Sequence, residues 1–245
     1  MRHIRTFLTI SYLIFGTALF GGLCWLAGLV QGPTGNGWWF FAQIWAKGLI
    51  KIGGIRGIHI LGEEKISLPQ AHVVMANHQS HFDVPLLISQ SKAPLRFVAK
   101  HSLFYFPIFG WALKATGHIP VNRKKREQAI KSLDNAASLI ASGRNVLVFP
   151  EGTRSDAPEL LPFKKGAFVL AIKSGVPIIP VGISGTDDIV PPKKFCNKVG
   201  PVTIIVGKPI ETASHTVENK EKLIHEVRES IEELKRMADQ HQQNL

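Results

Sequence analysis

The strongest constraint on this chain is a long stretch near its N-terminus that contains no charge. Between Thr6 and Ala46 there is no Asp, Glu, Lys or Arg, although the chain has 29 Lys and Arg and 18 Asp and Glu among its 245 residues. The part from Thr6 to Val30 is long enough to cross the hydrocarbon core of a bilayer, about 30 Å thick, as a helix. Its length and the lack of a small-residue cleavage site argue against a removable signal peptide. The protein must bury this stretch in a membrane or in its own core.

A turn divides the uncharged stretch into two arms. Residues 31–37, Gln-Gly-Pro-Thr-Gly-Asn-Gly, interrupt the apolar run. Residues 38–46 are rich in tryptophan and phenylalanine, as segments at membrane interfaces are, and are too short to span a bilayer before Lys47. We therefore predict an N-terminal membrane-anchoring helical hairpin over residues 1–52.

Basic residues flank both ends of this hairpin. Arg2 and Arg5 precede it, and Lys47, Lys51 and Arg56 follow its second arm. Because Lys and Arg gather on the cytoplasmic side of membrane segments, this favours a re-entrant or shallow hairpin, with the rest of the chain on the cytoplasmic face of an inner membrane. A single span, which would put the rest of the chain outside, and a hairpin buried in the core are the alternatives.

The composition agrees with membrane contact and with an anionic partner. Hydrophobic residues make up 45% of the chain, charged residues only 19%, and the mean hydropathy is +0.10, which is apolar for a soluble protein. The net charge of +11 fits anionic lipid or nucleic acid. The charge is dispersed and no nucleic-acid recognition motif is present, so we expect lipid and no nucleic acid. Cys24 and Cys196 lack the spacing of a disulfide framework or a metal site.

Residues 53–245 alternate short apolar runs with helical patterns. This alternation predicts one α/β domain with a mixed, largely parallel sheet flanked by helices. The expected strands are residues 55–60, 73–76, 96–99, 118–121, 145–149, 178–183 and 202–206, and the expected helices are residues 84–91, 103–115, 124–142, 163–174 and 217–240.

A candidate general base lies in residues 77–83, Asn-His-Gln-Ser-His-Phe-Asp, between an expected strand and an expected helix. Asp83, at the helix start, can fold back toward His78, fix its tautomer and stabilise its imidazolium. The other ring nitrogen can then take a proton from a substrate hydroxyl. As alternatives, Asp83 could only cap the helix, and His81 is a rival base. A metal site built from these three side chains is conceivable, but we expect no metal to be needed.

Residues 150–155, Pro-Glu-Gly-Thr-Arg-Ser, follow another expected strand. Loops that leave the strand ends of open α/β sheets collect in one crevice. Gly152 permits close backbone approach, Thr153 offers a hydroxyl, and Arg154 offers a planar fork suited to phosphate. Glu151 could hold that arginine or hydrogen-bond a substrate hydroxyl. The same residues could instead form a plain turn.

Two more segments next to expected strands could contribute to the same crevice. Residues 117–123 end in Arg123, and three further basic residues follow at a helix start, where cations are disfavoured unless an anion is bound. We therefore predict phosphate binding there. Residues 176–181 contain two prolines and no titratable group. This suggests a wall for an acyl chain, or prolines that simply mark the ends of a strand.

Four blocks in this order carry a resemblance to a known family. They are residues 77–83, 117–123, 149–155 and 176–181, and the first and third together are more specific than either alone. On these blocks the chain resembles the glycerolipid acyltransferases, and most closely the 1-acyl-sn-glycerol-3-phosphate acyltransferases. The hairpin also resembles the membrane anchor of that family, although it carries no sharp motif.

The resemblance implies a step of phospholipid biosynthesis. A fatty acyl group would pass from acyl-CoA or acyl-carrier-protein to the sn-2 hydroxyl of lysophosphatidic acid, giving phosphatidic acid without any cofactor. The second block departs from the family pattern at Pro120, where an aromatic residue is common, which leaves the acceptor open. The resemblance implies a catalytic dyad of His78 and Asp83 in an HX4D motif and substrate binding by Arg123, Glu151, Gly152, Thr153 and Arg154.

Two other functions stay open at this point. One is acyl transfer to a different lyso-lipid, and the other is a non-catalytic peripheral membrane protein that holds anionic lipid. The presence of both His78 and Asp83 counts against the second, because binding alone needs no dyad. We expect an enzyme in which His78 deprotonates the acceptor hydroxyl directly, so that no acyl-enzyme is needed.

Overall fold

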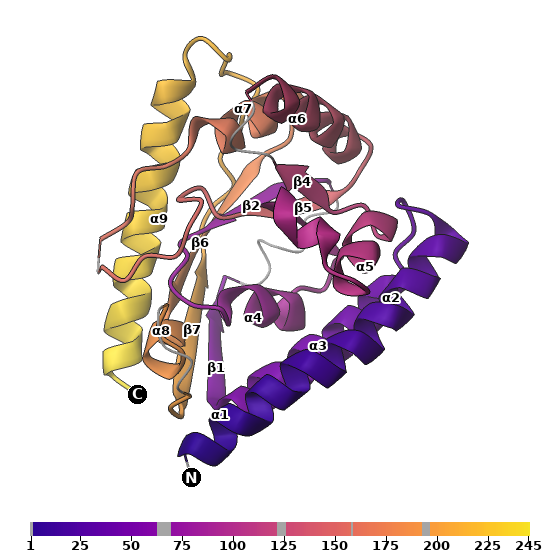
Figure 1. Ribbon diagram of the computed structural model, residues 1–245. Helices are drawn as coiled ribbons and strands as arrows, with labels where there is room; N and C mark the ends of the chain where they lie inside the picture. Colours follow the sequence, from indigo (N-terminus) through magenta and orange to yellow (C-terminus); the bar gives the residue numbers. More distant parts are fainter. Residues whose placement is uncertain (1, 63–69, 122–125, 158, 193–196) are drawn as a thin grey trace.

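The computed structural model describes residues 2–62, 70–121, 126–157, 159–192 and 197–245 (Figure 1). Its described residues form a seven-stranded sheet with the order β1-β7-β6-β2-β5-β3-β4, in which only the pair β6 and β7 is antiparallel. This confirms the predicted mixed, largely parallel α/β fold, and each strand lies within two residues of its predicted ends. The strands are β1 (Ile55–Leu61), β2 (Val73–Ala76), β3 (Leu95–Lys100), β4 (Ile119–Val121), β5 (Asn145–Val148), β6 (Ile178–Ser184) and β7 (Gly200–Val206).

Helices cover both faces of the sheet, and the sequence of β2 explains why. Successive side chains of a strand point to opposite faces. Val74 and Ala76 pack into the cluster beneath α3 and α4, whereas Val73 and Met75 pack against α6, α7 and α9. The helices are α1 (Arg2–Ser11), α2 (Thr17–Gln31), α3 (Trp38–Gly53), α4 (Asp83–Gln90), α5 (Phe109–Ala115), α6 (Arg126–Ala141), α7 (Lys165–Ser174), α8 (Thr186–Ile189) and α9 (Lys220–Gln243).

The predicted N-terminal hairpin is present, and it lies along the α/β domain (Figure 1). Its first arm, α1 and α2 joined by a π-helical turn at Tyr12–Gly16, is long and apolar enough to cross a membrane. We expected the aromatic residues of the second arm at a membrane interface. The structure instead buries Trp38 and Trp39, because α3 packs against α4 and joins the core of the domain.

A buried arginine fixes the hairpin turn to the domain. Arg96 of β3 donates to the carbonyls of Thr116, Pro33 and Gly35 at 3.0–3.2 Å, and its guanidinium lies 5.5 Å from the ring centre of Trp38. These carbonyls satisfy the cation away from water, as a buried charge requires. The turn of the hairpin is therefore held in a defined position over β3.

Two helices differ from the prediction. The helix expected over residues 103–115 is broken into a 3₁₀ turn at His101–Tyr105 and α5. Pro107 cannot donate to a helical ladder, and Ile108 has a φ of 61°, which a helix does not allow. The helix α8 was not predicted, because four residues are too few to show helical periodicity.

Candidate active site

The structure brings His78 and Asp83 together at the end of β2. His78 lies in the loop between β2 and α4, and Asp83 is the first residue of α4. The imidazole Nδ1 lies 2.8 Å from Oδ2 of Asp83. A carboxylate accepts, so Nδ1 is the donor, and in the neutral imidazole Nε2 then keeps its lone pair. The expected dyad is therefore formed with the free nitrogen on the side away from the carboxylate.

The Asp83 carboxylate is fully buried, and its other partners are all donors. Oδ2 accepts from the backbone N–H groups of Gln79 and Ser80, each at 2.8 Å, and Oδ1 accepts from the Thr186 hydroxyl at 2.6 Å. The N-cap residue of α4 is Phe82, which makes no side-chain capping hydrogen bond, and the Asp83 carboxylate bonds backbone groups that precede the helix. Such a set of donors holds the carboxylate in one orientation.

The His78 ring is held from several sides but stays open to solvent. It stacks on Phe149, with ring centres 4.0 Å apart, and its side chain is 18% exposed. Its backbone carbonyl accepts from Ser155 N–H at 2.8 Å. Upstream, the Asn77 amide bonds both the N–H and the carbonyl of Ile183, which ties the loop to β6. The His78 imidazole is thus positioned by β2, β5 and β6 together.

Glu151 differs from the sequence expectation. We expected it to contact substrate or Arg154, but it is 1% exposed and both of its oxygens accept backbone N–H groups, from His78 at 2.8 Å and Leu161 at 2.9 Å. Burial raises the pKa of this carboxyl, and the two hydrogen bonds partly offset that effect. In this geometry Glu151 joins the loop after β5 to the loop that carries His78.

A cleft with a volume of about 520 Å³ opens beside His78. The predicted residues Gly152, Thr153 and Arg154 all line it, and so does Lys100 at the end of β3, which the sequence analysis missed. Among the described carboxylates, none lies within ion-pair distance of Arg154. Burial lowers the pKa of Arg154, and the charge of Asp83 partly offsets this. The cleft therefore presents cations that an anionic substrate can pair.

His81, the rival base, lines the same cleft. Its side chain is exposed, but the loss of water around the ring at the cleft wall, and then the positive charge of Arg154, lower its pKa to about 4. A base with so low a pKa is a poor match for proton abstraction near neutral pH. The carboxylate hydrogen bond goes to His78, which we therefore retain as the base.

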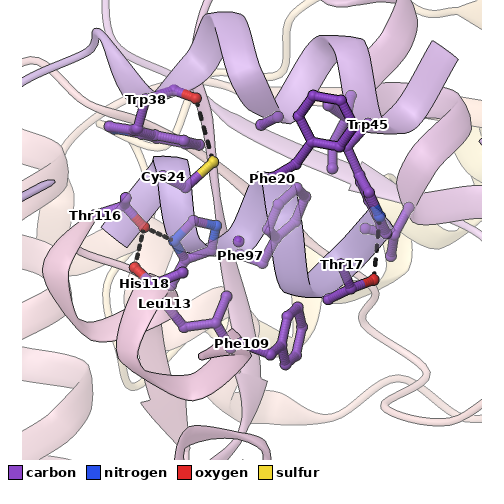
Figure 2. Close-up of a pocket in the computed structure, with 15 residues that line it drawn as sticks. Thr17, Phe20, Cys24, Trp38, Trp45, Phe97, Phe109, Leu113, Thr116 and His118 are labelled. Atoms are coloured by element: carbon purple, nitrogen blue, oxygen red, sulfur yellow. Dashed lines mark hydrogen bonds between the residues drawn. The ribbon is translucent and has the colours of Figure 1, made fainter. Parts of the chain in front are cut away.

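An apolar pocket of about 120 Å³ lies next to the cleft, beneath the hairpin (Figure 2). Its walls come mainly from α2, α3, α4 and α5, and Figure 2 shows Phe20, Cys24 and Trp38 of the hairpin together with Phe97 and His118 around the pocket. The two cavities share the side chains of Trp45, Val84, Phe97, Phe109 and Leu113.

Several residues that surround His78 or line the cleft were not assigned a role from the sequence. Thr186, Phe149 and Lys100 each stand at or just beyond the end of a strand, so the rule that placed the other loops in one crevice could have found them. The segment 176–181 was expected to form a wall or a strand, and it enters the buried strand β6. Arg123 lies outside the described residues. Within the described ranges, no group of three His, Cys, Asp or Glu residues is arranged to hold a metal ion.

Comparison with known proteins gives a consistent result. A family model described as "Acyltransferase" matches residues 57–184. A 1-acyl-sn-glycerol-3-phosphate acyltransferase of Chlamydomonas reinhardtii is 41% identical over 155 residues, which cover 62% of this chain and 46% of that protein. The protein of that name from Haemophilus influenzae is 32% identical, covering 71% and 72% of the two chains.

The fold comparison extends over nearly the whole chain. The crystal structure of the 1-acyl-sn-glycerophosphate (LPA) acyltransferase PlsC from Thermotoga maritima is similar, with a TM-score of 0.75 and 27% identity, covering 96% of this chain and 98% of that one. By contrast, this chain spans only about half the length of the first curated relatives that it matches.

Proposed function

This chain belongs to the acyltransferase family, and on that premise we propose that it forms phosphatidic acid from lysophosphatidic acid. A fatty acyl group passes from an acyl-CoA or acyl-carrier-protein thioester to the sn-2 hydroxyl of the acceptor. The observation that carries this proposal is the hydrogen bond of 2.8 Å between His78 and a fully buried Asp83, at the edge of a cleft lined by Arg154.

The dyad acts as a general base. Nε2 of His78 takes the proton of the acceptor hydroxyl as its oxygen attacks the thioester carbonyl, and Asp83 stabilises the imidazolium that results. When the tetrahedral intermediate collapses, the carbon–sulfur bond breaks and the imidazolium proton goes to the leaving thiolate. The new ester and a free thiol account for all atoms, and no acyl-enzyme is formed.

The cations of the cleft bind the acceptor phosphate. Arg154 offers a bidentate fork and Lys100 a point charge, and both line the cleft that contains His78. The resemblance adds Arg123 to this set. A guanidinium that has no carboxylate partner among the described residues and is partly removed from water gains more from an anion than a fully hydrated one would. Selection of a phosphomonoester acceptor follows from this charge.

The apolar pocket takes hydrocarbon. Its walls are almost entirely apolar and it borders the cleft. Each methylene group moved from water into such a space contributes about 0.8 kcal/mol. This supports an apolar acyl group as the transferred unit, with its carbonyl near His78 and part of its chain in the pocket beneath the hairpin.

The membrane is the source of the acceptor. The apolar first arm of the hairpin supports membrane attachment, because its outward side chains are exposed. We propose attachment to the inner membrane with the catalytic domain on its cytoplasmic face, as the flanking basic residues favour. The exposed apolar side chains of this arm are Ile4, Phe7, Leu8, Ile10, Ile14, Phe15, Leu19, Leu26, Leu29 and Val30.

The test is acyl transfer by the purified protein in detergent, with acyl-CoA and acyl-carrier-protein donors supplied separately. Lysophosphatidic acid and lysophosphatidylcholine are compared as acceptors. We expect phosphatidic acid from the first and at least about tenfold less transfer to the second, whose choline group masks the phosphate. Equal transfer to both would refute phosphate selection, and no transfer to either would favour a non-catalytic lipid-binding protein.

A further inference from the structure

Three aromatic side chains stand exposed where the chain passes the mouth of the cleft. Tyr105 is 71% exposed, Phe106 57% and Trp111 45%. Their neighbours Leu103 and Phe109 point into the cleft that contains His78. We call Tyr105, Phe106 and Trp111 the cleft-mouth aromatics. Large apolar side chains gathered on a surface mark a contact with a partner or with lipid.

The cleft-mouth aromatics continue the apolar surface of the hairpin. The Trp111 ring lies 5.3 Å from that of Trp25 in α2, and both line a shallow groove together with Leu29 and Lys114. Gly110 N–H donates to the carbonyl of Phe106 at 2.8 Å, which keeps Phe106 within one turn of Trp111. The first arm of the hairpin and the mouth of the cleft therefore present one connected apolar surface.

A strained turn produces this arrangement. Ile108 has a φ of 61° and a ψ of −62°, and Phe109 N–H donates to the Pro107 carbonyl at 2.6 Å, which closes a γ-turn. This form of γ-turn is rare and costs on the order of 1–3 kcal/mol for a non-glycine residue. It reverses the chain so that Phe106 faces outward while Phe109 enters the cleft. Strain of this kind persists where function requires the shape.

We propose that the cleft-mouth aromatics form a second membrane-contact element, which lies in the same leaflet as the hairpin and holds the mouth of the cleft against the lipid. This inference rests on the proposed function, because it concerns how a lipid acceptor reaches His78. The acceptor enters the cleft from the leaflet between the hairpin and this element, without crossing water.

The chemistry of the surface favours lipid over a second copy of the chain. Tyrosine and tryptophan concentrate at the depth of lipid headgroups, because their rings are apolar and their tips are polar. Lys114 lies in the groove beside Trp111, and Lys100 lines the cleft, so cations accompany the aromatics as they do at an anionic bilayer surface. The adjoining hairpin arm is itself apolar enough to enter a membrane.

The test compares one acceptor that lies in the bilayer with one that does not. Wild-type protein and a Tyr105→Ser/Phe106→Ser variant are reconstituted in phosphatidylcholine and phosphatidylglycerol vesicles. Each is given long-chain lysophosphatidic acid in the vesicles or a short-chain analogue dissolved as monomers. We expect the variant to lose about tenfold in kcat/KM for the bilayer acceptor and to stay within about twofold of wild type for the soluble one.

The matched control is Met237→Ser/Leu245→Ser. These two apolar side chains are 41% and 56% exposed at the C-terminal end of the chain, on α9 and just after it, across the sheet from the hairpin (Figure 1). We expect no change with either acceptor, and thermal unfolding of all proteins checks that each is folded. If the double variant Tyr105→Ser/Phe106→Ser unfolds, Phe106→Ser alone is used in the same test.

The outcomes separate this inference from the proposed function. A wild-type protein that acylates neither acceptor refutes the proposed function itself. If the wild type is active and the aromatic variant loses activity toward both acceptors equally, or toward neither, only the membrane-contact element is overturned. A variant that changes from dimer to monomer in detergent, with its acceptor preference unchanged, also overturns it and assigns the surface to a second copy.

Discussion

The cleft and the apolar pocket each contain a histidine, and the two histidines have opposite surroundings. In the cleft, His78 is bonded by Nδ1 to the Asp83 carboxylate, stacks on Phe149 and is partly exposed. In the pocket, His118 is bonded by Nδ1 to the Thr116 hydroxyl, and its ring lies 5.0 Å from that of Phe97. Burial, and then the charge of Arg96, lower the pKa of His118 to about 3.

This difference explains which histidine can act as a base. Both rings are oriented by a hydrogen bond and an aromatic neighbour, so orientation alone does not distinguish them. Only His78 has an anion to stabilise its imidazolium and an open space in which a hydroxyl can reach Nε2. His118 is kept neutral among apolar side chains, which suits a pocket for hydrocarbon.

The largest effect is expected from removing the anion that distinguishes the two histidines. Asp83→Asn replaces the carboxylate by an amide that cannot stabilise an imidazolium and that faces three other donors. Turnover should fall by roughly 10³–10⁴-fold, as an equivalent change does in a hydrolase triad. Single-turnover acyl transfer measures this loss, and retention of more than a tenth of the activity would show that the carboxylate is only structural.

The arginine of the cleft is predicted to have the next largest effect. Arg154→Gln removes the planar fork for the acceptor phosphate, and kcat/KM for lysophosphatidic acid should fall by about 10- to 100-fold. Transfer to lysophosphatidylcholine, measured beside it, should change far less. An equal loss with both acceptors would assign Arg154 to the acyl donor instead.

His118, the histidine of the pocket, should affect the stability of the protein rather than catalysis. Because its folded pKa lies near 3 and the unfolded value is 6.5, the unfolded chain takes up this proton first as the pH falls. The free energy of unfolding is therefore highest above pH 6.5. It falls between pH 6.5 and about 3, by up to about 1.4 kcal/mol per pH unit.

His118→Asn removes this titration while keeping a hydrogen-bonding group beside Thr116. Urea unfolding of both proteins at several pH values measures the difference. The variant should be less stable near neutral pH but should lose less stability on acidification. Parallel pH profiles would mean that the histidine does not stay neutral in the pocket.

The smallest effect is predicted for the hydroxyl that supports the carboxylate. Thr186→Val removes one of the donors to Asp83 and should lower kcat about five- to tenfold with little change in KM. Thr186→Ser, which restores the hydroxyl, should recover most of the activity. A serine variant as impaired as the valine variant would point to packing around α8 rather than to this hydrogen bond.

The sequence predicted the parts of this protein that depend on local pattern. The apolar runs located the seven strands that the described residues form, because a strand that is buried on both faces is apolar throughout. The spacing of His78 and Asp83 predicted their pairing, because a strand-to-helix loop returns the helix start toward the strand end. The hairpin followed from the lack of charge and from its turn.

What the sequence did not predict depends on distant parts of the chain. The hydroxyl of Thr186 donates to Asp83, which is 103 positions away in the sequence. The carboxylate of Glu151 accepts hydrogen bonds from two backbone N–H groups, and no local sequence pattern identifies them. The burial of Trp38 depends on how the hairpin packs on the domain, because the same aromatic residues would suit a membrane interface. Periodicity also failed at Ile108, where a γ-turn breaks the expected helix.

The most direct test of this account measures phosphatidic acid formation by wild type, His78→Ala, His81→Ala and His118→Asn in the same detergent. His78→Ala should lose at least about 10³–10⁴-fold in turnover, because the Asp83 carboxylate acts only through this positioned base. The other two variants should each stay within about tenfold of wild type. Full activity of His78→Ala, or a larger loss in either of the other variants, would contradict the assignment of the base.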